Sequence, residues 1–494
     1  MFAPAPHGFA QRLTALPAGD RRLLAAWTGA ALAALLLGVM FGLATAWARF
    51  GLAGAGAEAG YRALTLHGVT AFFYWLYFAQ GAVLLAVSAA YAGDEPRLAL
   101  APMSAIAFAL MLAGLAANMT AILGGPPLLY NAPPELVDDS SRASAGWFYA
   151  GYLLLGAGLV VMALPALATG LRAKSRGHDW PVPGFAAAAW AGLLMVSGVA
   201  AFGAFLGPAL WTWGLGAMPA DTETRWHVLF HNLHYLPLMG AALVWYVLVF
   251  ELTGVPSIFG DAFSKRVWAV YLLFVPPTSL YHMFLDPGLT PSVRVLGSLL
   301  SLFISVPTVA VFLILVASLE SAGRARGAKG VFGWLGLLPW REPGMNAIAM
   351  AIVNLALGGV FAFVLIQEKL APLLSDTFFV PAYFHFLTVG AVSLSLLAAL
   401  GRLIVGLAGR PLPAARLLSA LPYAVTLGLV LFGGAGMWAG LMGMPRRAMA
   451  VDYDGAAPAA WAVLSPLIGV GGAVMGVALL VYAAILLAAL PWRL

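Results

Sequence analysis

Residues 225–237 read Arg-Trp-His-Val-Leu-Phe-His-Asn-Leu-His-Tyr-Leu-Pro and open a long apolar segment. This stretch carries three of the eight histidines of the chain, His227, His231 and His234, at the spacing i, i+4 and i+7. On an α-helix that spacing projects all three imidazoles from one face. Imidazoles are rare inside membrane spans and are common metal ligands. The stretch therefore predicts a metal site on one side of a membrane span.

The composition of the whole chain is that of a polytopic membrane protein. Of its 494 residues, 62% are hydrophobic and only 9% are charged, with a mean hydropathy of +0.93. The absence of cysteine excludes disulfides, iron–sulfur clusters, thiolate haem ligands and a Cys-bridged copper centre from this chain. No basic run with interleaved aromatic residues indicates nucleic-acid binding. Arg12, Arg21 and Arg22 precede a long first span without a cleavage signature, which indicates an anchor rather than a signal peptide.

The apolar segments and the basic loops together predict the topology. Most of the 25 Lys and Arg residues fall on one side if the N-terminus is cytoplasmic. We predict an all-α integral membrane protein in lipid, with about twelve transmembrane helices and both termini cytoplasmic. It comprises a cytoplasmic segment (1–22), one membrane domain (23–490) and a short tail (491–494). The expected spans are roughly 23–48, 62–92, 98–124, 145–171, 184–214, 226–252, 267–285, 295–319, 345–367, 378–401, 417–442 and 458–490.

Histidines from four distant segments lie at one level on this topology, nearer the outer surface. They are His67, His231, His282 and His385. A haem iron takes two axial imidazoles, and a copper ion takes two to four. Any single one of them is equally well explained as a histidine that is hydrogen-bonded inside the bundle. Taken together at one depth, they favour buried metal ligands.

An arginine pair, Arg446 and Arg447, lies on the same outer side after the eleventh span. Haem propionates are carboxylates, which guanidinium groups bind in a forked geometry. The alternative for an isolated pair is two arginines that extend to the membrane interface. Beside the histidine level, propionate binding is the better interpretation.

Six motifs follow one another along nearly the whole chain. They read Leu-Thr-Leu-His67-Gly-Val, His231-Asn-Leu-His-Tyr235, Tyr281-His282-Met-Phe-Leu-Asp-Pro-Gly, Ala-Ser-Leu-Glu320 through Gly-Trp334-Leu-Gly-Leu-Leu-Pro-Trp340, Val-Pro-Ala-Tyr383-Phe-His385 and Pro-Arg446-Arg447-Ala. In this order the chain resembles subunit I of the haem–copper oxidase superfamily, and its B-type branch most closely. The resemblance implies the helix arrangement of subunit I of these oxidases. It also implies that His67 and His385 are the axial ligands of a low-spin haem of b type. It also implies propionate binding by the arginine pair.

The same resemblance implies a copper site with His231 and His282 as ligands, and Tyr235 as the tyrosine that oxidases cross-link to a copper ligand. Three residues depart from the family's motifs, and two of these departures bear on the high-spin haem. Tyr281 stands for a copper-binding histidine, Tyr383 stands for the histidine of the high-spin haem, and Ser375-Asp376-Thr377 replaces the family's His-Asn-Thr. We therefore expect a lost or altered high-spin haem site. His227 or His234 is a candidate for the missing copper ligand. Tyr383 either binds haem iron as a tyrosinate or fills the space of a missing haem.

Three functional hypotheses remain open. The first is an oxidoreductase that reduces O2 or NO, in the inner membrane of a bacterium. Because the chain lacks cysteine, it would need another subunit or a periplasmic donor such as cytochrome c or a cupredoxin-like protein. The second is a non-catalytic derivative with one haem, acting as an electron conduit or a gas or redox sensor. The third is copper handling or transport at residues 225–237.

Proton delivery is less distinct in the sequence. Candidate hydroxyls are Tyr246, Tyr271, Ser301, Ser305 and Thr308, and Tyr246 and Thr308 match proton-path positions of the B-type branch. Hydroxyls that bond back to their own helix are equally expected in membrane spans. Glu251 and Glu320 fall at inner span ends, where exposed acidic residues are ordinary.

Overall fold

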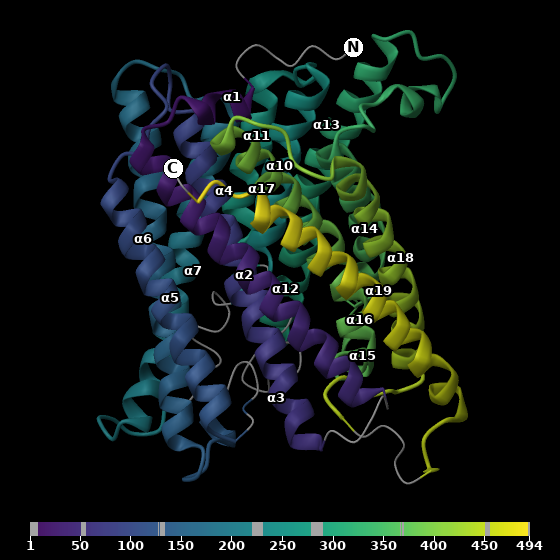
Figure 1. The fold of residues 1–494 in the computed structure, drawn as a ribbon. Coiled ribbons are helices and arrows are strands. Elements are labelled where there is room, and N and C mark those ends of the chain that lie inside the picture. The colour runs from purple at the N-terminus through teal and green to yellow at the C-terminus, as the bar shows by residue number, and fades with distance from the viewer. Residues whose placement is uncertain are drawn as a thin grey trace.

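The computed structural model is a bundle of long helices (Figure 1). It describes residues 8–50, 56–126, 128, 134–219, 231–277, 290–365, 367, 370–449 and 455–492, with the backbone alone for residues 231, 294, 297, 298 and 301. Within that part, eleven helices are long and apolar enough to cross a membrane: 18–49, 57–90, 101–124, 142–175, 182–212, 232–253, 305–324, 343–365, 379–408, 415–441 and 459–489. The predicted all-α membrane architecture is confirmed.

The elements follow one another along the chain with short connections. The first half comprises α1 (Phe9–Thr14), α2 (Ala18–Arg49), α3 (Ala57–His67), η1 (Gly68–Trp75), α4 (Leu76–Ala90), α5 (Ala101–Gly124), η2 (Pro134–Leu136), α6 (Arg142–Ser175) and α7 (Val182–Thr212). The second half comprises η3 (His231–His234), α10 (Leu236–Thr253), α11 (Gly260–Phe274), α12 (Pro291–Phe303), α13 (Ser305–Arg324), η5 (Gly333–Leu337), α14 (Pro343–Leu365), α15 (Ala371–Leu374), α16 (Phe379–His385), η6 (Phe386–Ser393), α17 (Leu394–Ala408), α18 (Ala415–Leu441) and α19 (Ala459–Ala489).

Two of the expected spans differ in detail. The expected span 267–285 begins earlier, as α11 at Gly260, and residues 278–289 lie outside the described part. The expected span 295–319 is divided between α12 and α13, which begins at Ser305. Pro307 explains the break, because a proline ring clashes with the carbonyl four residues earlier and α12 ends at that residue, Phe303.

The three most buried of the described spans carry the candidate histidines His67, His234 and His385. The most apolar windows of spans 57–90, 232–253 and 379–408 are 89%, 83% and 83% buried, against 33–61% for the other eight. A polar imidazole that faced lipid would lack hydrogen-bond partners, so histidine-bearing helices belong at the centre of the bundle. The burial order therefore agrees with a functional site inside the bundle.

Small residues allow some helices to approach closely. A Cβ added at Gly156 of α6 would lie 2.7 Å from the carbonyl oxygen of Gly198 on α7, and the reverse distance is 2.8 Å. Close backbone approach at small residues is how membrane helices associate when lipid offers no hydrophobic drive.

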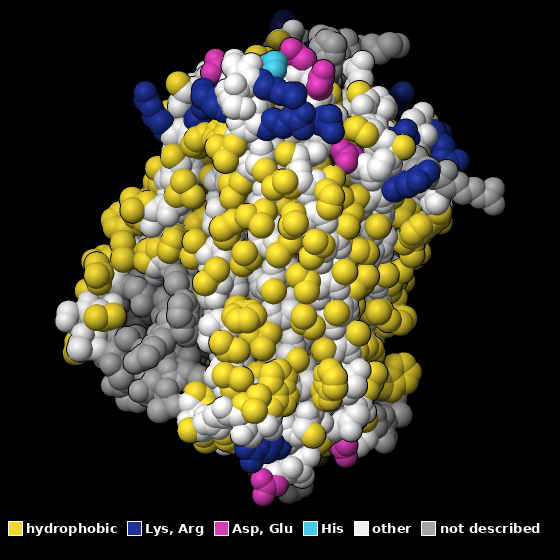
Figure 2. Space-filling view, turned by 90° about the vertical axis from the view of Figure 1, so that its left-hand side faces the viewer, with side chains coloured by type: hydrophobic (Ala, Val, Ile, Leu, Met, Phe, Trp, Pro, Cys, Tyr) yellow, Lys and Arg dark blue, Asp and Glu magenta, His cyan; other side chains and the backbone are white. Residues whose placement is uncertain are grey.

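α1 and the carboxyl end of α19 both lie toward the upper end of the bundle in Figure 1. In Figure 2 most of the visible Lys and Arg side chains gather at that same end, above a broad apolar belt. An even number of crossings and a one-sided basic distribution are what the topology prediction requires. The cytoplasmic assignment of this end stays a prediction.

We expected Glu251, at the carboxyl end of α10, to be exposed. In the structure its side chain is buried. Its side chain is 3% exposed, and its Oε1 accepts hydrogen bonds from Arg402 Nε at 3.0 Å and Nη2 at 2.8 Å. The backbone N–H of Ala10 in α1 donates to the same oxygen at 3.2 Å. The expectation failed because sequence position marks a span end but does not show that α1 folds over it. Glu320, by contrast, forms the exposed i, i+4 ion pair with Arg324.

Candidate functional site

His67 and His385, which lie 318 positions apart in the sequence, approach each other in the bundle interior. Each is the last residue of its α-helix, α3 and α16 respectively. Their ring centroids are 6.2 Å apart, and the ring planes differ by only 15°. A ring of Phe432 from α18 packs against His385 at 4.8 Å. The two histidines that the sequence predicted as partners are therefore brought together.

Hydrogen bonds orient both imidazoles in the same way. His67 Nδ1 lies 2.8 Å from the carbonyl oxygen of Gly38, and His385 Nδ1 lies 2.6 Å from that of Pro381. A carbonyl only accepts, so Nδ1 carries the hydrogen in each ring and Nε2 keeps its lone pair for a metal. Gly42 allows the first contact, because a Cβ there would lie 2.8 Å from His67 Nδ1.

The spacing of the two rings fits one metal ion between them. Metal–imidazole bonds are about 2 Å long and a ring centre lies roughly 1 Å behind its nitrogen, so two axial imidazoles have centres about 6 Å apart. The observed separation is 6.2 Å. A bis-histidine haem therefore fits the donor set and its geometry.

A large cavity of about 1310 Å³ adjoins the histidine pair. Pockets for single small molecules usually measure about 300–1,000 Å³, so this one has room for a macrocycle and more. Its wall is largely apolar, with the polar residues His67, His234, Tyr235, Tyr271, Thr308, Ser375, Asp376, Tyr383, His385, Arg446 and Arg447 among its lining. Most of the described site candidates thus share one chamber.

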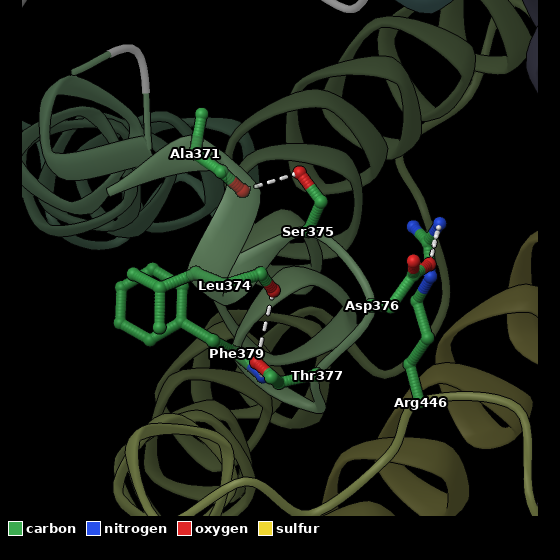
Figure 3. A network of polar contacts seen from close by, with 7 residues as sticks. All are labelled: Ala371, Leu374, Ser375, Asp376, Thr377, Phe379 and Arg446. Atoms are coloured by element: carbon green, nitrogen blue, oxygen red, sulfur yellow. Dashed lines mark hydrogen bonds and ion pairs between the residues drawn. The ribbon is translucent and has the colours of Figure 1, made fainter. Parts of the chain in front are cut away.

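Arg446, the first residue of the arginine pair, is held at the cavity by contacts between the 375–378 and 444–446 segments (Figure 3). Arg446 Nη2 pairs with Asp376 Oδ1 at 2.8 Å, and the Arg446 N–H donates to the Asp376 carbonyl at 3.0 Å. Next to them, the Phe378 N–H donates to the Met444 carbonyl at 2.7 Å. Ser375 Oγ, in Figure 3, donates to its own helix at Ala371. Asp376 therefore already supplies Arg446 with one carboxylate partner.

Arg49, at the end of α2, is a residue of this site that the sequence analysis missed. It is 6% exposed, and it donates to the carbonyl oxygens of Pro445 and, at 2.7 Å, Arg446. Its guanidinium also lies 4.5 Å from the ring centroid of Phe378. The buried Arg49 guanidinium therefore contacts both segments, 444–446 through the two carbonyls and 375–378 through the ring of Phe378. A lone arginine at a span end carries no sequence signal that would distinguish this role from interfacial anchoring.

Tyr383 and His234 lie in the aromatic part of the cavity. Tyr383 is 4% exposed and packs against the rings of Phe379 at 6.0 Å and Phe384 at 6.3 Å. His234 packs 4.7 Å from the ring of Phe72 and 6.4 Å from that of Phe384. Tyr235, the next residue, lines the same chamber. These three side chains therefore share one chamber with the histidine pair, and their roles stay predictions.

The sequence predicted an α-helix with three histidines on one face over residues 225–237. For residues 231–235, which the structure describes, this prediction is wrong. His231–His234 form a 3₁₀ turn, and α10 begins only at Leu236. The proline at Pro237 suits the first turn of a helix and no later position, which explains the start. Within the described residues, no three His, Asp or Glu side chains cluster as a metal site. His227, Tyr281 and His282 lie outside the described part, as does the His231 side chain, so the copper set and the copper-handling hypothesis stay predictions.

Comparison with known proteins agrees with this arrangement. The family model for cytochrome c and quinol oxidase polypeptide I matches residues 22–474. The chain belongs to this family. It is 28% identical over 431 residues to cytochrome c oxidase subunit 1 of Thermus thermophilus, covering 85% of this chain and 75% of that one.

The fold comparison reaches further along the chain. A cryo-EM structure of a heme-copper terminal oxidase dimer superimposes with a TM-score of 0.86 at 22% identity, covering 96% of this chain and 84% of that one. At this identity the likeness shows the fold alone. Family membership itself implies terminal-oxidase-type electron transfer, with haem and copper as the family's cofactors.

The hydroxyls that we considered for proton delivery in this oxidase-family chain are partly connected. Tyr271 OH donates to Thr308 Oγ1 at 3.2 Å, and both line the cavity. Thr308 and Ser305 also bond back to their own chain, at Ile304 and Leu302. Both interpretations of these hydroxyls therefore stay open, and the Ser301 side chain lies outside the described part.

Replacing Arg49 with methionine tests its role in the site. The substitution leaves two half-buried carbonyls, those of Pro445 and Arg446, without their charged donor, at a cost of up to about 1.5–3 kcal/mol for each bond. We expect the 444–447 segment to loosen and haem loss from the purified protein to accelerate about tenfold or more, measured as transfer to an excess of a haem-free acceptor protein. Arg326→Met is the matched control, because Arg326 also donates to two carbonyls, at Ala322 and Thr253, and lies outside the cavity lining and the histidine-bearing spans. Equal haem loss in both variants would contradict the assignment.

Proposed function

We propose that this chain is the haem-bearing subunit I of a respiratory terminal oxidase, in which His67 and His385 hold a low-spin haem of b type. The observation that carries the proposal is the parallel pair of imidazoles, 6.2 Å apart, with both Nδ1 atoms engaged by carbonyls. The arginine pair on the wall of the same cavity supports it, since haem propionates require such partners.

Each residue of the site has a definite task in this proposal. A low-spin haem, when bound, supplies reversible one-electron transfer. His67 and His385 would hold it through their Nε2 lone pairs, and the carbonyls of Gly38 and Pro381 keep the Nδ1 atom of each ring engaged. Arg446 and Arg447 neutralise carboxylates at the cavity rim, and the apolar wall excludes water. An apolar surrounding and fixed hydrogen bonds to the ligating histidines are means by which a protein sets a redox potential.

We place the reaction site in the rest of the cavity, where Tyr235 and Tyr383 line the wall. The copper ligands in this proposal are His231 and His282, with His227 or His234 as the third. The substrate is O2, with NO as the alternative, and Tyr271 and Thr308 are candidates for proton delivery. Electrons come from another subunit or from a periplasmic cytochrome c or cupredoxin-like donor, because the cysteine-free chain has no dinuclear copper centre of its own. The proposed location is the inner membrane of a bacterium, with the basic end cytoplasmic.

A specific observation favours a second candidate, a non-catalytic member that keeps one haem as an electron conduit or sensor. Tyr383 occupies the wall of the cavity where the resemblance leads us to expect a histidine, and it packs among phenylalanine rings. Asp376 also places a carboxylate against Arg446, where it competes with a haem propionate. An unassisted tyrosine is a poor ligand at neutral pH because its pKa is near 10.

A haem and copper count on the purified protein, with optical spectra, separates the candidates. The oxidase predicts two haems and one copper per chain, a CO-sensitive reduced spectrum and O2 or NO consumption with a suitable donor. One six-coordinate haem that ignores CO would support the second candidate and reject turnover. A preparation that takes up no haem, even after reconstitution with excess haem, would reject both.

A further inference from the structure

The two spans that carry His67 and His385 share an unusual backbone feature. Each changes from α-helix to π-helix at the residue after its histidine: η1 covers Gly68–Trp75 and η6 covers Phe386–Ser393. Both π segments are eight residues long. π-helical turns are rare and occur frequently at functional sites. Hydropathy does not reveal them, so the sequence analysis had no signal for this feature.

The far ends of these two π segments are joined by a hydrogen bond. Trp75 Nε1, on the last residue of η1, donates to Ser393 Oγ, on the last residue of η6, at 2.9 Å. Ser393 Oγ in turn donates to the carbonyl oxygen of Thr388 inside η6, at 2.8 Å. Trp75 is 1% exposed and Ser393 is 4% exposed. The indole donor and the hydroxyl are thus both satisfied in an interior where water is scarce.

This bond closes a loop of structure around the candidate haem site. The path runs from His67 through η1 to Trp75, across to Ser393, and back through η6 to His385. Trp75, Ser393 and Thr388 all line the cavity that adjoins the two histidines. The hydrogen bond therefore links the two histidine-bearing spans directly, eight residues after the histidine in each span.

The π segments explain why the hydrogen bond between Trp75 and Ser393 affects the direction of the imidazoles. Each residue of an α-helix turns the chain by about 100° around the helix axis. A change of one residue in a π-helical turn therefore rotates the side chains before that turn relative to those after it. The direction of each imidazole relative to the body of its span therefore depends on how firmly its π segment is held. In η6, the Ser393 bond to Thr388 closes this turn directly, and in η1 Trp75 anchors the end of the turn.

We propose that Ser393 and Trp75 are positioning residues that set the mutual orientation of His67 and His385 as axial ligands. The inference rests on the proposed low-spin haem. Neither side chain touches the imidazoles in this role. They act by fixing the π segments, and so hold the two rings nearly parallel, at the observed 15°, and at one separation. Ligand orientation and outer hydrogen bonds tune a metal centre without changing its ligands.

The test is Ser393→Ala in the full-length, haem-loaded protein. We expect haem to bind with six-coordinate optical bands, but the low-spin electron paramagnetic resonance signal should shift and broaden as the ring planes adopt a range of angles. Transfer of haem to an excess of a haem-free acceptor protein should accelerate several-fold, as expected when one buried hydrogen bond is lost. Trp75→Phe should reproduce both changes, and Ser393→Thr, which keeps a hydroxyl, should restore the wild-type signal.

A closely matched control lies two residues further along the same span. Trp245 Nε1 donates to Ser395 Oγ at 2.6 Å, which is the same kind of buried bond, but it joins α17 to α10, which carries neither axial ligand. Neither of these residues lines the cavity. Ser395→Ala should lower stability as much as Ser393→Ala does and leave the haem signal unchanged.

The possible outcomes separate the two claims. A wild-type protein without a six-coordinate haem signal rejects both the proposed function and this inference. A normal wild-type signal that Ser393→Ala and Trp75→Phe leave unchanged overturns the positioning role alone. Equal spectral shifts in Ser393→Ala and Ser395→Ala also overturn it, because a general loss of packing would then explain the effect.

Discussion

Replacing His385 with alanine should abolish the low-spin haem spectrum of the purified protein. The substitution removes one of two imidazoles whose ring centres lie 6.2 Å apart, and the remaining His67 cannot complete six-coordination alone. We expect loss of the six-coordinate bands and at least a tenfold drop in the haem retained after purification. The measurement is the reduced-minus-oxidised optical spectrum, with haem content determined by pyridine haemochrome.

Two further variants make the His385 result specific. His178→Ala removes a histidine of a loop between α6 and α7, outside the cavity lining, and should leave the spectrum unchanged. His385→Gly with added imidazole should recover part of the six-coordinate signal, since the free ligand can enter the vacated volume. A normal spectrum in His385→Ala would refute the ligand assignment.

Replacing Arg402 with methionine should strongly destabilise the fold. It leaves Glu251, whose side chain is 3% exposed, as a buried carboxylate without its ion-pair partner. Breaking one side of a buried pair typically costs about 3–5 kcal/mol, and we expect the lower end because Arg402 is itself 26% exposed. The measurement is the free energy of unfolding in mixed detergent micelles, followed by circular dichroism.

The double variant Glu251→Gln with Arg402→Met separates the charge effect from lost packing. Removing both charges should recover more than half of the lost stability, because the penalty comes from the unpaired charge and not from the missing contact. Arg324→Met is the surface control and should cost less than about 1 kcal/mol, since its pair with Glu320 is exposed. Equal losses in Arg402→Met and Arg324→Met would contradict the structural role.

Much of the fold was predictable from local sequence because lipid imposes a local rule. Backbone groups without water must be paired within the segment, so an apolar run of sufficient length has to be helical. That rule predicted most of the spans. It failed at the expected span 295–319, where Pro307 decided the break, and over His231–His234, where a 3₁₀ turn replaced the expected α-helix. Both failures occur where the chemistry of single residues overrides hydropathy.

The candidate site was predictable in its members but not in its supports. Counting residues along spans placed His67 and His385 at one depth, and the structure brings their ring centres to 6.2 Å from each other. Arg49 and Ser393 escaped prediction because their roles depend on partners hundreds of residues away. Such side chains carry no local pattern, since an arginine at a span end and a serine inside a span have ordinary explanations.

By itself, therefore, the sequence determined that this protein is a membrane helix bundle of the oxidase type, and which histidines share a level within it. Length, apolarity and spacing act along one segment at a time, and they suffice for those conclusions. Only the tertiary structure decided that α1 covers Glu251, that Arg49 secures the arginine loop, and that two π-helical turns are tied together beneath the histidine pair. Those contacts join distant segments, and packing in three dimensions is what selects them.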